Sequence, residues 1–118
     1  MVSEIKRKYG CFSDSWISDI DVKRNHISII ITCANLINDC RYEVIELVFK
    51  NVTFYNNGTN ENDVTISVKD ALLEHKNGLI VFDLDPIDHF DYLAENENSD
   101  FKIISKEITC SFVKYFDK

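Results

Sequence analysis

The sequence predicts a mostly antiparallel β domain of the α+β class, built as a curved sheet, a small sandwich or a half-barrel with one or two short helices. Apolar and polar residues alternate with a period of two over much of the chain, which is the pattern of half-buried strands. Several of these stretches are separated by hairpin-length turns, which favours antiparallel pairing. The 118 residues include one Pro and three Gly. No linker composition divides them, so we expect a single domain over residues 1–118.

The first strands are predicted over residues 16–22 and 26–33, with a three-residue turn at positions 23–25. A long strand or bent pair follows over residues 42–55. In the second strand every other residue is apolar, and these residues would share the face that packs on the core: Ile27, Ile29, Ile31 and Cys33.

The remaining strands are shorter and lie in the second half of the chain. A polar loop is predicted over residues 56–63, because it is rich in Asn and contains Gly58. Strands are predicted over residues 64–68, 79–84, 101–104 and 108–116.

A first short helix is predicted over residues 69–76. Ser67 and Asp70 have the spacing of a capping box, and Asn77-Gly78 resembles a helix stop.

A second short helix is predicted over residues 86–95. Asp85-Pro86 has the form of an N-cap followed by the first helical residue. On a helix, an apolar stripe would face the sheet and an acidic stripe would lie beside it. The apolar stripe is Ile87, Phe90 and Ala94, and the acidic stripe is Asp88, Asp91 and Glu95.

The negative charge is concentrated in one part of the chain. Twenty acidic and 13 basic residues give a formal net charge of −7. There is no Lys or Arg between Lys76 and Lys102, and this interval contains seven acidic residues: Asp83, Asp85, Asp88, Asp91, Glu95, Glu97 and Asp100. The rest of the chain is therefore balanced. This regional acidity argues against direct binding of nucleic acid.

The cysteines and the lack of long apolar segments favour a cytoplasmic protein without a metal or other cofactor. Cys11, Cys33, Cys40 and Cys110 form no C-x-x-C pair, so neither a zinc ribbon nor a thioredoxin-type site is expected. We expect reduced thiols, with Cys33 and Cys110 in the core. No apolar run reaches the ~18 residues of a membrane span, and no apolar segment of a secretory signal follows the basic residues at positions 6–8.

One segment has the form of a catalytic motif. A buried strand that ends in Asp-x-Asp at positions 83–85 is how haloacid-dehalogenase-type phosphatases present their catalytic carboxylates. The alternative function is therefore a metal-dependent phosphohydrolase or nuclease using Asp83, Asp85 and His89. The chain beyond Asp85 is too short to supply the parallel α/β sheet of such an enzyme. We therefore predict no enzymatic activity.

The acidic region is instead predicted to bind a protein. Carboxylates on a rigid scaffold can occupy the cationic cleft where an enzyme binds phosphates, and electrostatic steering makes such association fast. Tyrosine is enriched at interface hot spots. The predicted partner-binding face consists of Asp85, Asp88, Asp91, Tyr92, Glu95 and Glu97.

Three segments carry a resemblance to a known group of proteins. They are Phe-Ser-Asp-Ser-Trp-Ile at residues 12–17, Leu-Val-Phe-Lys-Asn-Val at 47–52 and Ser-Asp-Phe-Lys-Ile at 99–103. Together with the predicted hairpin between the first two segments, this likeness spans most of the chain, which resembles small immunity proteins of bacterial polymorphic-toxin and contact-dependent growth inhibition systems. Ser13 stands where many relatives have His. The resemblance implies tight one-to-one binding of a cognate toxin domain, often a nuclease, in the cytosol. We expect a monomer or weak dimer that binds this toxin and neither nucleic acid nor a membrane.

Overall fold

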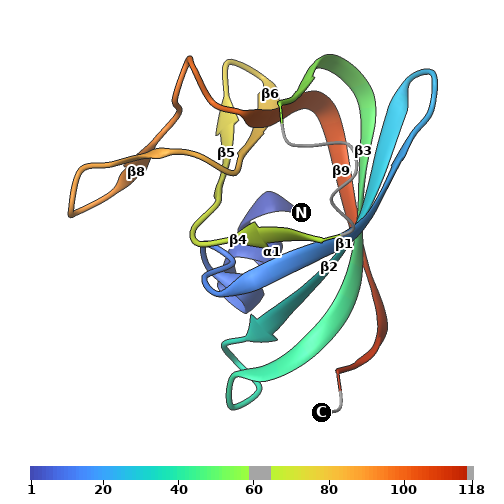
Figure 1. Ribbon diagram of the computed structural model, residues 1–118, viewed down its shortest axis with the longest axis vertical. Coiled ribbons are helices and arrows are strands. Elements are labelled where there is room, and N and C mark those ends of the chain that lie inside the picture. The colour runs from blue at the N-terminus through green and yellow to red at the C-terminus, as the bar shows by residue number, and fades with distance from the viewer. Residues whose placement is uncertain (59–64, 117–118) are drawn as a thin grey trace.

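The chain folds as a strongly curled antiparallel sheet with one helix, in a computed structural model that describes residues 1–58 and 65–116 (Figure 1). The main sheet has seven strands in the order β4-β1-β2-β3-β9-β6-β5, and a separate two-stranded sheet is formed by β7 and β8. This confirms the predicted fold class in its half-barrel form. The elements are α1 (Val2–Tyr9), β1 (Ser15–Val22), β2 (His26–Asn35), β3 (Arg41–Asn57), β4 (Ile66–Val68), β5 (Leu72–Lys76), β6 (Leu79–Asp83), β7 (Ile87–Asp88), β8 (Leu93–Ala94) and β9 (Phe101–Tyr115).

The predicted first hairpin is confirmed by the pairing of β1 with β2, which runs from Trp16 opposite Thr32 to Val22 opposite Ile27. A bulge between Ile17 and Asp19 shifts the register. The expected inner face of β2 is also confirmed, because Ile27, Ile29, Ile31 and Cys33 are all buried.

Two long strands form the middle of the sheet. β3 is one strand of 17 residues and pairs along most of its length with β9, which has 15. The prediction of two strands over residues 101–104 and 108–116 is therefore wrong: they are one bent strand. Register shifts in the β3–β9 ladder mark where the ribbon bends, because bulges increase local twist. The predicted loop at 56–63 and the start of the predicted strand at 64 lie largely outside the described residues.

The helix predicted over residues 69–76 does not form. Residues 72–76 are β5, an antiparallel partner of β6. Asn77 and Gly78 have φ of 55° and 77°, as a two-residue type I′ hairpin turn requires. Asn-Gly between two apolar stretches is a stronger signal for a hairpin than for a helix end, and the pairing with buried β6 overrides the capping-box spacing.

The two edges of the sheet are joined directly by the chain. β4 and β5 are the edge strands, yet only Lys69–Ala71 separate them in sequence. This link is held to the segment after α1, since Ala71 N–H donates to Cys11 O (2.7 Å) and Asp14 N–H donates to Lys69 O (3.3 Å). The short segment Lys69–Ala71 therefore holds the two edge strands of the curled sheet near each other.

The N-terminal helix was not anticipated from the sequence. In α1, Val2, Ile5 and Tyr9 are buried at the spacing of one helical face. The basic residues at 6–8 lie in the last turn, where they favourably oppose the helix dipole. The helix ends at Gly10, which has φ 59° and whose N–H donates to Lys6 O (2.8 Å).

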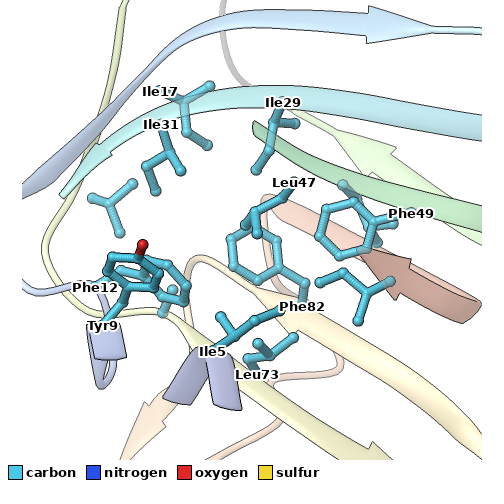
Figure 2. Close-up of a cluster of buried hydrophobic side chains, with 14 of the residues drawn as sticks. Ile5, Tyr9, Phe12, Ile17, Ile29, Ile31, Leu47, Phe49, Leu73 and Phe82 are labelled. Carbon is cyan, nitrogen blue, oxygen red and sulfur yellow. The ribbon is translucent and has the colours of Figure 1, made fainter. Parts of the chain in front are cut away.

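The core fills the inside of the curl and is rich in aromatic rings (Figure 2). Phe82 is central: its ring centroid lies 5.3 Å from that of Phe49 and 5.9 Å from that of Phe12, the latter in an edge-to-face arrangement. Such pairs add about 0.5–1.5 kcal/mol beyond the burial of their area. Ile5 and Tyr9 of α1 close this core from the side of the helix (Figure 2).

The described residues contain no disulfide; Cys33 is buried and Cys110 half-buried against the core, as predicted. Within residues 1–58 and 65–116, no helix has the length and apolar character needed to cross a membrane.

Candidate protein-interaction site

The segment between β6 and β9 forms a hairpin that projects away from the curled sheet (orange in Figure 1). β7 pairs with β8, with Ile87 opposite Ala94 and Asp88 opposite Leu93. The helix predicted over residues 86–95 is therefore wrong, and so are its apolar and acidic stripes. Asp85-Pro86 precedes a strand here rather than a helix.

The tip of this hairpin is a tight turn held by hydrogen bonds. His89 N–H donates to Tyr92 O (3.0 Å), and Asp91 N–H donates to His89 O (2.9 Å). The Asp88 carboxylate accepts from Phe90 N–H (2.8 Å). Asp side chains commonly stabilise turns in this way, so the carboxylate that was expected on a helix face instead shapes the turn.

Phe90 occupies the most exposed position of the tip. Its exposed fraction is 101%, and its φ is 72°. The left-handed region costs a residue with a side chain about 1 kcal/mol, and leaving a phenyl ring in water forfeits its burial energy. Strained backbone positions of this kind concentrate at functional sites. An exposed, strained aromatic residue is therefore the feature of the hairpin that most needs explanation.

Other apolar groups accompany Phe90. The rings of His89 and Tyr92 stack with centroids 4.8 Å apart. Tyr92 is 62% exposed, and Ile87 is also exposed. The hairpin therefore exposes three large apolar side chains, those of Ile87, Phe90 and Tyr92. The helical spacing of Ile87 and Phe90 predicted that they pack on the sheet. No local signal in the sequence predicts that they are exposed to solvent.

Four of the predicted partner-binding carboxylates lie on the same hairpin or at its base. Asp85, Asp88, Asp91 and Glu97 are all exposed. The hairpin segment itself contains no Lys or Arg. Exposed apolar side chains and carboxylates thus occur together on one projecting element, and protein interfaces combine an apolar centre with a polar rim.

The fifth predicted carboxylate, Glu95, holds the hairpin in place. Lys102 Nζ lies 2.8 Å from Glu95 Oε2, and Lys76 Nζ lies 3.0 Å from Glu95 Oε1. The side chain of Glu95 is only 16% exposed. The hydrogen bond from Lys102, followed by the one from Lys76, lowers the pKa of Glu95. Both oxygens of Glu95 are thus occupied within the chain.

Asp83 ties the two legs of the hairpin together at its base. It is fully buried. Its Oδ1 accepts from Asp85 N–H (2.9 Å) and its Oδ2 from Asn96 N–H (2.8 Å). Asn96 in turn donates through Nδ2 to Asp85 O (2.9 Å). The hairpin therefore leaves the sheet from a hydrogen-bonded base.

The residues of the alternative enzymatic function lie in different surroundings. Asp83 is buried at the base, where backbone N–H groups occupy both of its oxygens, whereas His89 lies in the turn at the tip. Among the described residues there is no group of three or more His, Cys, Asp or Glu side chains placed to hold a metal ion.

A cleft of about 450 Å³ separates the hairpin from the body of the domain. Tyr92 and Leu93 line it on one side. Residues 71–74, at the start of β5, and Gly10 and Cys11, just after α1, line it on the other. The hairpin thus has one face toward the domain and one face toward solvent.

Comparison of the chain with protein-family models, curated proteins and solved structures found no match.

Proposed function

We propose that the chain is an immunity protein, which neutralises a cognate toxin domain by one-to-one binding through its hairpin. The observation that carries this proposal is Phe90, which is fully exposed and at positive φ among carboxylates. A chain gains nothing in its own stability from this arrangement, whereas a partner that buried the ring would gain binding free energy.

The hairpin has the two components of a strong interface. Phe90 and Tyr92 are large, rigid apolar groups that can fill a pocket in a partner, and aromatic anchors of this kind dominate hot spots. The surrounding carboxylates provide long-range attraction toward a positively charged surface, which raises the association rate.

The expected partner is a basic cleft. A nuclease domain binds phosphates in such a cleft, so an acidic hairpin inserted there would exclude the nucleic acid. The toxin class itself comes from the sequence resemblance, and the acidity of the hairpin is compatible with it.

The proposal requires no conformational change in the chain. The ion pairs of Glu95 and the hydrogen bonds of Asp83 already hold the hairpin in one arrangement. A pre-ordered binding element loses little entropy on association.

The experiment uses the toxin domain encoded beside this chain in its genome. Isothermal titration calorimetry should give a one-to-one complex that weakens as salt rises. Phe90→Ser should weaken the complex by about a hundredfold, the effect of a hot spot of ~3 kcal/mol. Asp88→Lys combined with Asp91→Lys should slow association.

The matched control is Phe54→Ser, which removes another exposed aromatic ring, on β3 outside the hairpin. This variant should bind as tightly as the unmodified chain. If Phe90→Ser also binds with unchanged affinity, the hairpin is not the binding element. If no complex forms with any toxin domain encoded nearby, the proposed function is wrong.

A further inference from the structure

Beneath α1 lies a cavity that is separate from the hairpin. Its volume is about 250 Å³. The helix contributes one wall and the inner face of the sheet the other, at the end of the core where β2 finishes and β3 begins. The lining of the cavity includes two acidic side chains, Glu4 and Glu43, together with Lys8, Tyr9, Asn35, Cys110 and Phe112.

Glu43 is the unusual residue of this cavity. On β3 it falls on the same face as Ile45, Leu47 and Phe49, all of which are fully buried. It is itself only 5% exposed. A carboxylate at the first inward position of a core strand is costly to bury unless it is neutralised.

Two neutral groups hold the Glu43 carboxylate in position. Tyr9 Oη–H donates to Oε1 (2.9 Å), and Asn35 Nδ2–H donates to Oε2 (2.9 Å). Burial, and then this hydrogen bond, raise the pKa of the Tyr9 hydroxyl. The hydroxyl therefore stays protonated as a donor. Each carboxylate oxygen has room for a further donor.

No cation among the described residues forms an ion pair with Glu43. In residues 1–58 and 65–116 no Lys, Arg or His nitrogen lies within ion-pair distance of it. Lys8 lines the same cavity but forms no ion pair with Glu43. The described residues thus place a buried carboxylate beside an open volume without a direct ion pair.

We propose that this cavity binds a small organic cation, an alkylguanidinium or alkylammonium ion, with its charged end on Glu43. The N–H groups of such a cation supply the donors that the carboxylate oxygens can still accept. Phe112, which is exposed, also lines the cavity, and aromatic rings attract cations. A metal ion fits less well, because among the described residues no three His, Cys, Asp or Glu side chains are placed together to hold one.

This inference does not depend on the proposed toxin, so it can fail or succeed separately. The test is titration of the free protein with n-butylguanidinium and n-butylammonium at constant ionic strength, followed by calorimetry and by two-dimensional NMR. n-Butanol, which has the same alkyl chain without the charge, is the ligand control. Constant ionic strength is needed because the net charge of −7 attracts cations non-specifically.

We expect saturable binding at one site, with shifted amide signals at Glu43 and Cys110. Glu43→Gln should weaken it by at least about tenfold, because a charge-assisted bond is lost. Glu46→Gln removes the same charge from the same strand but from its other face, and it should leave binding unchanged. Cys110→Leu should block the cavity without altering the carboxylate, which provides a second test if Glu43→Gln folds poorly.

Three outcomes would overturn the proposal. The first is no saturable binding of either cation below about 10 mM. The second is equal binding by the unmodified chain and by the Glu43 or Cys110 variant. The third is equal binding of n-butanol, which would show that the cavity selects the alkyl chain and not the charge.

Discussion

At the scale of single residues, Phe90 is exposed at the tip of the hairpin, whereas Asp83 and Glu95 hold its base. The positive φ of Phe90 has a steric cost, because its Cβ clashes with the backbone in this conformation. Asp83 and Glu95 use all four of their carboxylate oxygens to hold the hairpin at its base. The part that is exposed for a partner is thus distinct from the part that stabilises the element, and mutations at the two should have different effects.

The strain at Phe90 is testable without a partner. Phe90→Ala keeps a Cβ at φ 72°, whereas Phe90→Gly removes the steric conflict. The Gly variant should therefore have the larger free energy of unfolding, by about 1 kcal/mol, as measured by urea denaturation. A more stable Ala variant would show that the turn is not left-handed in solution.

Asp83→Asn should destabilise the fold by about 2 kcal/mol, because an amide NH₂ replaces one acceptor and leaves the half-buried N–H of Asp85 or of Asn96 unpaired. Asp85→Asn is the matched control. Asp85 is exposed, so its variant should change the free energy of unfolding by less than about 0.5 kcal/mol. Equal effects of the two substitutions would contradict the role of Asp83 at the base.

Glu95 should make stability depend on pH. Its pKa in the folded chain is lowered from the ordinary 4.5 by its two lysines. Its contribution is therefore present above pH 4.5 and is lost as the pH falls through the lower folded-state value. Glu95→Gln should lower the free energy of unfolding at pH 7 by about 2 kcal/mol. Denaturation curves should show this difference shrinking below pH 4.5; a difference that persists undiminished in acid would refute it.

At the scale of elements, the hairpin and the half-barrel differ in their connections. β7 and β8 form their own two-stranded sheet, while the strands of the barrel form a continuous ladder from β4 to β5. Isolated two-stranded hairpins are marginally stable in water. The base contacts of Asp83 and Glu95 supply the support that the β7–β8 pairing lacks.

Replacing residues 88–93 by Asn-Gly should shorten the hairpin and spare the barrel. The free energy of unfolding should stay within about 1 kcal/mol of the unmodified value, because few of the removed side chains are buried. Binding of the toxin domain should be lost. Thermal unfolding and calorimetry measure the two effects, and collapse of the fold would show that the hairpin is part of the core.

At the scale of the whole molecule, the chain separates an acidic projecting element from a closed core. The sheet curls until three residues suffice to link its two edges, and α1 covers the core from the side. Cys33 is sealed in this core, whereas Cys40 lies exposed in the turn between β2 and β3. The reactivity of the thiols therefore reports whether the domain is closed.

Burial raises the pKa of both the Cys33 and the Cys110 thiols, so both should react slowly in the native protein. Cys40 should react first with a thiol reagent, and Cys33 only at the rate of unfolding. All four thiols should react in denaturant without a reductant. Mass spectrometry gives the order of modification, and rapid labelling of Cys33 in the native protein would contradict the closed core.

The sequence by itself determined the class of the fold and the location of the charge. Period-two alternation predicts β2 and its inner face because strand burial is set by local periodicity, and the acidic run is visible in composition alone. The tertiary structure decided the hairpin, the inward position of Glu43 and the strand at residues 72–76. The spacing of Ile87, Phe90 and Ala94 suits a helix, but the contacts that select the hairpin come from Asp83, Lys76 and Lys102. Likewise, Glu43 meets Tyr9 from 34 residues away. Contacts between distant parts of a chain outweigh weak local propensities. Such contacts cannot be predicted from the local sequence pattern.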